Sequence, residues 1–175
     1  MYVPQQAGDN CRDENFYTGG GINDCADKCV LMTDIEGRAD SNCVSEAALK
    51  AGAFFACDAG EDGILGALWE LAECLNTGID IDMLKIPLRQ ETVEICEFYD
   101  LNPYRISSAG CSVCAAKDGF ELVRRLESEG IPASLAGKTT SGKARIVRKR
   151  EIVQYITPPK RERAQREKYL ELLRL

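Results

Sequence analysis

The chain has 175 residues, 45% of them hydrophobic, which is enough to bury the core of one ordinary domain and excludes disorder throughout. The first 20 residues are polar and lack the apolar segment of a secretion signal, and no window approaches the roughly 18 apolar residues that a membrane span needs. We therefore expect a cytoplasmic protein whose nine cysteines are thiols. Histidine is absent, so any chemistry must use carboxylates, thiolates, lysine or a borrowed group.

The net charge of -6 conceals a division of the chain into an acidic and a basic part. Residues 1–137 carry 10 basic and 24 acidic side chains, a net charge of -14, whereas residues 138–175 carry 12 and 4, a net charge of +8. The charge pattern predicts an acidic domain followed by a basic appendage.

Three regions follow from the pattern along the chain. Residues 1–21 have no periodicity and are predicted to form a loop or disordered arm, residues 22–157 a domain, and residues 158–175 a basic helix. Within the domain, helices and strands alternate, which predicts an α/β (α+β) sandwich with a mixed sheet, flanking helices and partial ferredoxin-like topology. In the first half, the predicted elements are a strand at 28–33, a helix capped by Ser41 or Asn42 and closed by Gly52, a strand at 53–57, a helix at 64–75 and a strand at 78–82. In the second half, they are a helix at 91–99, a strand at 111–116, a helix from Asp118 to about 128, a strand at 133–136 and a hairpin of 144–148 with 151–156.

The turn at residues 57–63 joins a short buried strand to the amphipathic helix 64–75. Gly60 and Gly63 would let backbone amides approach an anion at the helix start, and Asp58 and Glu61 could hold a divalent cation beside it. The alternative is a capped helix, in which Asp58, Glu61 or Asp62 accepts hydrogen bonds from first-turn amides.

Residues 137–144 nearly match a phosphate-binding P-loop. The motif needs Ser or Thr after Lys143, where this chain has Ala144, and it needs a following helix, where this chain alternates as a strand. A turn between two strands is therefore the favoured interpretation.

Cysteine pairs at 25/29 and 111/114 could together offer four thiolates to zinc or an iron–sulfur cluster. In a strand, however, a spacing of three places Cys111 and Cys114 on opposite faces, which favours small buried thiols. If a metal is bound, Cys11, Cys25 and Cys29 are the best candidates. Cys57 is a candidate nucleophile at the helix start, although no base accompanies it.

The basic tail, residues 160–168, could bind nucleic acid or an acidic protein. Its interspersed glutamates are also typical of a solvated helix that stabilises itself through ion pairs. The leucines at its end could instead mediate self-association, and beside an acidic domain we do not expect nucleic-acid binding.

Three segments, residues 58–73, 86–96 and 101–110, resemble the C-terminal domain of the aminoimidazole ribonucleotide (AIR) synthase (PurM) family, in particular hydrogenase expression/formation proteins of the HypE type and AIR synthase-related proteins. The resemblance extends from about residue 53 to 137. Family members commonly carry His-Asp-x-Thr-Glu-Gly-Gly at the turn, where this chain has Cys57, Gly60 and Asp62 at the His, Thr and first Gly positions. HypE-type proteins end in a cysteine that accepts the carbamoyl group, whereas this chain ends in Leu175.

The resemblance implies an ATP-binding family with ligase- or dehydratase-like activity, whose members also have an N-terminal domain that supplies most ATP and metal ligands. It implies that Asp58, Gly60, Glu61 and Gly63 line the nucleotide cleft, with ATP and Mg²⁺ bound only together with a partner. We expect an ATP-binding partner protein or a homo-oligomer, and hydrogenase maturation proteins as possible partners. Three functions remain open: a component of ATP-dependent carbamoyl or amide chemistry that is not catalytic alone, a non-catalytic binding or regulatory descendant, and a thiol-ligated metal or redox module.

Overall fold

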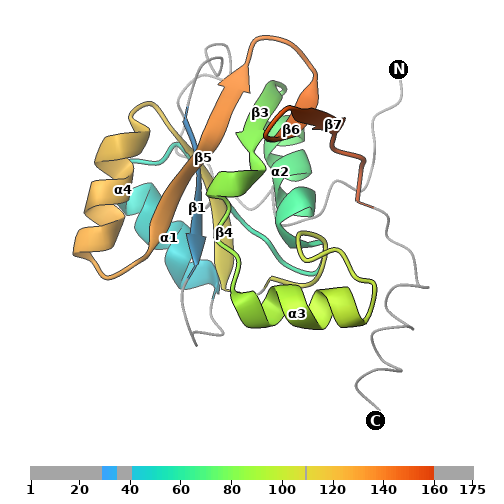
Figure 1. Cartoon of the computed structure of the whole chain (residues 1–175). Coiled ribbons are helices and arrows are strands. Elements are labelled where there is room, and N and C mark those ends of the chain that lie inside the picture. Colours follow the sequence, from blue (N-terminus) through green and yellow to red (C-terminus); the bar gives the residue numbers. More distant parts are fainter. Residues whose placement is uncertain (1–28, 35–40, 109, 160–175) are drawn as a thin grey trace.

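The computed structural model describes residues 29–34, 41–108 and 110–159 (Figure 1). The predictions for residues 1–21, and for the tail from residue 160 onward, fall outside the described residues. Within the described part of the chain, no helix has the length and apolar character to cross a membrane.

The described elements follow the predicted order of helices and strands. They are β1 (Cys29–Asp34), α1 (Ser41–Ala51), β2 (Phe55–Asp58), α2 (Gly63–Cys74), β3 (Gly78–Asp82), the short 3₁₀ helix η4 (Met83–Lys85), α3 (Gln90–Phe98), β4 (Cys111–Ala116), α4 (Gly119–Ser128), β5 (Ala133–Thr140), β6 (Arg145–Lys149) and β7 (Ile152–Tyr155).

The described strands form one mixed sheet in the order β2-β4-β1-β5-β3-β6-β7. Four of them, β2, β4, β1 and β5, are antiparallel to their neighbours and are joined as β1-α1-β2 and β4-α4-β5, which is a ferredoxin-like arrangement. The segment α2-β3-η4-α3 is inserted between these two halves. The partial ferredoxin-like topology is therefore confirmed.

The predicted hairpin is present, because β6 and β7 pair antiparallel around Arg150, which has a φ of 56°. β6 pairs with β3 in parallel, and β3 separates it from β5. The inserted strand β3 thus takes the place beside β5.

Two apolar layers cover the sheet, one on each face (Figure 1). Helix α2 covers one face, with Leu68 and Leu71 fully buried, while α1 and α4 cover the other, with Val44 and Leu126 fully buried. Strands β2, β4 and β5 supply side chains to both layers, because successive side chains point to opposite faces. Helix α3 lies beyond the end of the sheet, outside both layers (Figure 1).

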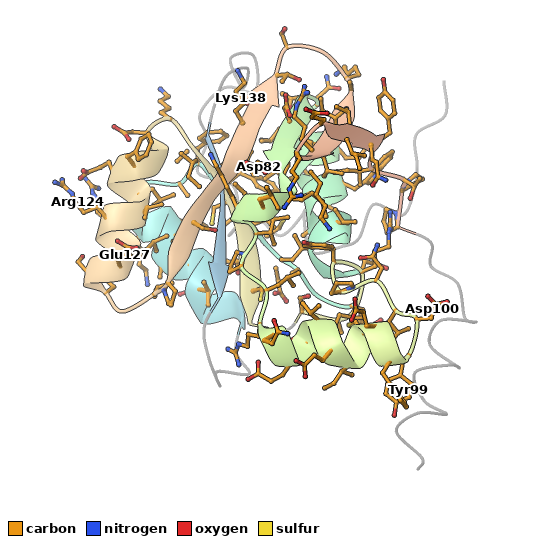
Figure 2. All side chains as sticks on the ribbon, viewed as in Figure 1. Asp82, Tyr99, Asp100, Arg124, Glu127 and Lys138 are labelled. Atoms are coloured by element: carbon orange, nitrogen blue, oxygen red, sulfur yellow. The ribbon has the colours of Figure 1, made fainter. Side chains whose placement is uncertain are left out.

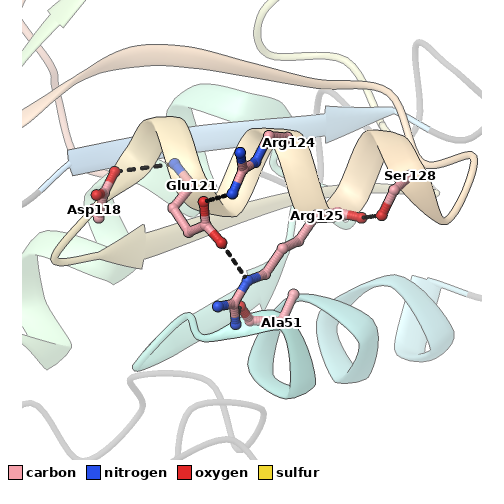
Figure 3. A network of polar contacts seen from close by, with 6 residues as sticks. All are labelled: Ala51, Asp118, Glu121, Arg124, Arg125 and Ser128. Carbon is pink, nitrogen blue, oxygen red and sulfur yellow. Dashed lines mark hydrogen bonds and ion pairs between the residues drawn. The ribbon is translucent and has the colours of Figure 1, made fainter.

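Helix α4 is fastened at its start and to its neighbour α1 (Figure 3). Asp118 caps it, accepting a 3.0 Å hydrogen bond from the Glu121 amide, as predicted. Arg125 donates through Nε to Glu121 and through Nη1 to the carbonyl of Ala51, the last residue of α1. The hydrogen bond from Arg125, together with the charges of both neighbouring arginines, lowers the pKa of Glu121. This network fixes the spacing of the two helices on their face of the sheet.

Candidate functional site

The predicted turn lies at the carboxyl end of β2, where the chain enters α2. Strands β1, β2 and β3 run in the same direction, so all three finish at one end of the sheet, and each ends in an aspartate: Asp34, Asp58 and Asp82. Sequence reasoning singled out only Asp58. The sequence signal that was missed is an aspartate at the end of β1, β2 and β3, three of the four described strands that run in this direction. Among the described residues, however, no group of three His, Cys, Asp or Glu side chains is close enough to hold a metal ion.

Asp58 and Cys57 project to opposite faces of the sheet. Cys57 is buried in the layer under α2, where its thiol lies 3.7 Å from the carbonyl oxygen of Ala67. Asp58 pairs in register with Ser112 of β4, and strand alternation places it on the face covered by α1. Its Oδ1 is buried and has no hydrogen-bond partner among the described residues. A buried Cys57 does not have the access to solvent that a nucleophile needs.

Both glycines of the turn have backbone conformations that favour glycine. Gly60 has a φ of 49° and Gly63 a φ of 67°. A Cβ at Gly60 would meet nothing within 4 Å, so the space beside it is open. A Cβ at Gly63 would lie 2.5 Å from the carbonyl oxygen of Ile106 and 2.8 Å from that of Tyr104. Gly63 is thus required by close packing of the backbone, and Gly60 by conformation alone.

The loop that follows α3 packs directly on this turn. The Leu65 amide, in the first turn of α2, donates to the carbonyl of Tyr104 at 3.0 Å, and the Ser108 amide donates to the carbonyl of Gly60 at 3.0 Å. Asp62 is the N-cap residue of α2, but its side chain makes no capping hydrogen bond. Asp62 therefore does not cap α2 with its carboxylate, as the capped-helix interpretation would have it. Instead, the Leu65 amide in the first turn donates to a carbonyl of a loop distant in sequence.

The four predicted residues consequently differ in access to a ligand. Glu61 is exposed, Asp58 and Gly60 are partly buried, and Gly63 is buried. The side of the turn open to solvent is formed by Gly60 and Glu61, and it can offer one carboxylate and backbone groups to a ligand. Gly63 is buried and shapes the turn through its close contact with the loop that carries Tyr104.

The predicted separation of Cys111 and Cys114 is confirmed. Cys111 packs against the layer under α2, while Cys114 is fully buried in the layer under α1 and α4. The five cysteines whose side chains the structure describes are thiols. Cys11 and Cys25 lie outside the described residues, and Cys29 is described only as a backbone position in β1.

The P-loop-like segment is the end of β5 and the turn into β6, as its composition favoured. Lys143 donates through Nζ to the Asn76 carbonyl at 2.5 Å and to the Asn76 side chain, at the end of α2. A Cβ at Gly78 would lie 2.5 Å from the carbonyl of Ala144, so this turn packs tightly on the α2–β3 connection. The lysine that would bind phosphate in a P-loop here satisfies carbonyls at a helix C-terminus.

Comparison with solved structures supports the fold. E. coli HypE, a hydrogenase maturation protein, is 17% identical, with a TM-score of 0.67 over 82% of this chain and 53% of that chain. HypE in a HypE–HypF complex is 16% identical, with a TM-score of 0.65 over 77% of this chain and 53% of that chain. HypE in complex with ATP is 14% identical, with a TM-score of 0.65 over 76% of this chain and 51% of that chain. The chain therefore spans about half the length of these structures. No curated protein matches its sequence.

A family model gives the assignment that such low identities cannot. The model described as "AIR synthase related protein, C-terminal domain" matches residues 37–149, more than half of the chain. The match includes α1, the turn between β2 and α2, the inserted segment and the strands from β2 to β6. The chain belongs to the AIR synthase-related family and carries its C-terminal domain.

Proposed function

We propose that this chain is one component of ATP-dependent carbamoyl or amide chemistry, such as hydrogenase maturation, and that it acts with a separate ATP-binding partner. The observation that carries the proposal is the family match over residues 37–149 in a chain that spans about half the length of the HypE structures. One of those structures is a complex with ATP. A partner that supplies an ATP-binding domain would complete the nucleotide site, and we do not expect this component to be catalytic without such a domain.

The turn between β2 and α2 is the proposed ligand contact. Glu61 would bind the phosphates indirectly, through Mg²⁺, because oxygen ligands suit this ion and bare carboxylates repel phosphate. Asp58, partly buried on the face covered by α1, would line the cleft behind it. The open space at Gly60 suits close approach of a ligand to the backbone.

Proteins of hydrogenase maturation are the proposed class of partner. The support is the HypE–HypF complex among the similar structures. At 16% identity that similarity concerns the fold, so the partner must be tested directly.

A non-catalytic binding or regulatory role is the second candidate, and one observation favours it. The Tyr104 carbonyl already accepts the hydrogen bond of the Leu65 amide, and the same loop packs against Gly63. A helix start that is partly filled by its own chain has fewer amides to offer a phosphate.

Calorimetry with Mg-ATP distinguishes the two candidates. We expect no binding heat from the full chain alone and measurable heat from its mixture with a HypE-type ATP-binding partner. In that mixture, Glu61→Gln and Gly60→Ala should each weaken binding about tenfold, or 1.4 kcal/mol. Gly130→Ala is the matched control, since Gly130 also has a positive φ and open space but lies in the α4–β5 connection.

Absence of heat in every mixture would contradict the ATP-dependent role and favour the binding module. A thiol-ligated metal is tested separately by elemental analysis of anaerobically purified protein. A preparation without stoichiometric zinc or iron would leave Cys11, Cys25 and Cys29 without a metal role.

A further inference from the structure

Helix α3 presents an exposed face that combines carboxylates with large apolar side chains. Glu91, Glu94, Ile95 and Phe98 have the i, i+3, i+4, i+7 spacing of one helix side, and we call this set the α3 face. The exposed fractions of Ile95 and Phe98 are 57% and 81%. Within α3 itself only Cys96 is buried.

The apolar part of the α3 face continues past the end of the helix. The Tyr99 ring, 41% exposed, packs edge-on against Phe98 with 4.9 Å between ring centroids. Figure 2 shows Tyr99 at the outer end of α3, pointing away from the body of the protein. α3 makes no extensive contact with another described helix or strand. An apolar patch of this kind in a soluble protein usually marks an interaction surface.

The charge of this region restricts what can cover it. Residues 90–100 contain four acidic side chains, Glu91, Glu94, Glu97 and Asp100, and no basic ones. Pairing two α3 faces would bring together four carboxylates on the faces and eight in residues 90–100 of the two copies, which disfavours a symmetric contact. The occupant should therefore combine apolar side chains with basic ones.

The described chain ends close to this region. Arg105, in the loop that follows α3, donates through Nη2 to the Thr157 carbonyl at 3.2 Å and to the Thr157 hydroxyl at 2.6 Å. Pro159 lies beside Gly66 in the first turns of α2, near the same loop. Residues 160–175 therefore start on the side of the molecule where α3 ends.

The sequence of residues 160–175 has the required composition. It contains six basic and three acidic residues, a net charge of +3, and five large apolar residues from Tyr169 onward. At helical spacing, Arg163, Arg166, Leu170 and Leu173 share one side. Sixteen residues span about 24 Å as a helix, more than the roughly 14 Å of the nine-residue α3.

We infer that residues 160–175 bind the α3 face of their own chain. The basic side chains meet Glu91, Glu94 or their acidic neighbours, and the leucines cover Ile95 and Phe98. This explains together why α3 is so poorly buried by the described residues and why a basic segment follows an acidic domain. It assigns the tail an internal partner rather than nucleic acid.

Hydrogen exchange on the full-length chain tests the contact from the α3 side. Because few other contacts hold α3, its amides should exchange about tenfold faster when Leu170→Asp and Leu173→Asp are introduced together. The matched control is Phe120→Asp on α4, which alters an equally exposed aromatic residue, 77% exposed, away from α3. That control should leave α3 exchange unchanged.

Limited trypsin digestion tests it from the tail side. Phe98→Asp should speed cleavage after Arg163 and Arg166 several-fold, and Phe120→Asp should not. Charge reversal at Glu91 and Glu94 should have the same effect as Phe98→Asp. Because reversing Arg163 and Arg166 removes these trypsin sites, the rescue is read by hydrogen exchange: reversing both in the same chain should restore slow exchange of the α3 amides.

Unchanged α3 exchange in the tail variant, or unchanged tail cleavage in Phe98→Asp, would overturn the inference. A protection of α3 that grows with protein concentration would also overturn it, because the occupant would then be a second copy. Protection that is independent of concentration and lost in the tail variant supports it.

Discussion

Cys114 shows what burial does to a single ionisable side chain. It lies in the middle of β4, fully buried in the apolar layer under α1 and α4, and desolvation raises the pKa of its thiol from 9.0 to about 12. The neutral thiol is therefore favoured in the folded protein, whereas the unfolded chain ionises near pH 9. The stability from this group is fully present below pH 9 and is lost as pH rises through 12.

The loss of stability at high pH that follows from the raised pKa of the Cys114 thiol gives a prediction for Cys114→Ala. The variant loses packing at neutral pH but cannot lose stability by thiol ionisation. Its deficit in free energy of unfolding relative to the wild type should shrink by about 2 kcal/mol between pH 8 and pH 10.5. Urea unfolding at both pH values, under reducing conditions, measures the deficit. Tyrosine ionisation affects both proteins alike, so a deficit that does not change with pH would contradict the assignment.

At the scale of elements, the four α-helices that the structure describes end in the same way. A residue with positive φ follows the helix, and the next amide returns to a carbonyl in its last turn, which is the Schellman arrangement. The positive-φ residues after α1, α2, α3 and α4 are Gly52, Asn76, Asp100 and Gly130. The amide of the following residue donates to a carbonyl five positions back: Ala53 to Ala48, Thr77 to Ala72, Leu101 to Cys96 and Ile131 to Leu126.

Two of these ends use glycine and two do not, which predicts opposite effects of substitution. Asp100→Gly should stabilise the protein by about 0.5–1 kcal/mol, because it relieves a φ of 52° and removes a negative charge at a helix C-terminus. Gly130→Ala should cost about 1 kcal/mol through strain alone, because no atom lies within 4 Å of the added Cβ. Thermal unfolding measures both.

Asp100→Asn separates the two causes at that helix end. Asparagine keeps a side chain at positive φ while losing the charge, so it should recover only the electrostatic part of the gain. Equal stability of Asp100→Asn and Asp100→Gly would mean that backbone strain contributes nothing there.

Elements with strong local patterns could be predicted from the sequence with little error. The strands at 78–82 and 111–116 have the predicted bounds, because alternation and a short apolar run are local signals. β5 was predicted to stop at residue 136 but continues to Thr140. Gly137 resembles a turn residue, yet its missing side chain is what lets β5 approach β3, with Asp80 O only 2.2 Å from a Cβ built there.

The candidate site shows the same limit. The turn and its two glycines could be predicted from residues 57–63, since conformation at a strand–helix junction is local. The loop carrying Tyr104 could not be foreseen to close over Gly63, because the contact joins residues about forty positions apart and depends on the inserted segment.

For the whole molecule, the charge division seen in the sequence becomes a set of contacts between its two parts. Arg148 on β6 pairs with Asp80 on β3 at 2.7 Å, and Lys143 binds the Asn76 carbonyl at the end of α2. Arg145 pairs with Glu73 on α2 at 2.5 Å, and its guanidinium lies 3.8 Å from the centre of the Trp69 ring. Basic side chains of residues 138–175 thus attach the β6–β7 hairpin to the acidic part of the chain, residues 1–137.

Arg145 is the strongest of these attachments, because its side chain is only 12% exposed and has two partners on one helix. Arg145→Met should cost about 1–2 kcal/mol, combining a half-buried ion pair with a cation–π contact. The control is Lys50→Met, which removes an exposed pair with Glu46 at 3.6 Å and should cost less than about 0.5 kcal/mol.

Arg145→Lys tests how the attachment works. Lysine keeps the charge but lacks the planar group that stacks on Trp69, so its cost in urea unfolding should lie between wild type and Arg145→Met. In 1 M salt the ion-pair part is screened while the ring contact persists, so the penalty of Arg145→Met should fall without disappearing. If Arg145→Met costs no more than Lys50→Met, then apolar packing beneath β6 holds the hairpin, and the opposite charges of the two parts contribute nothing to joining them.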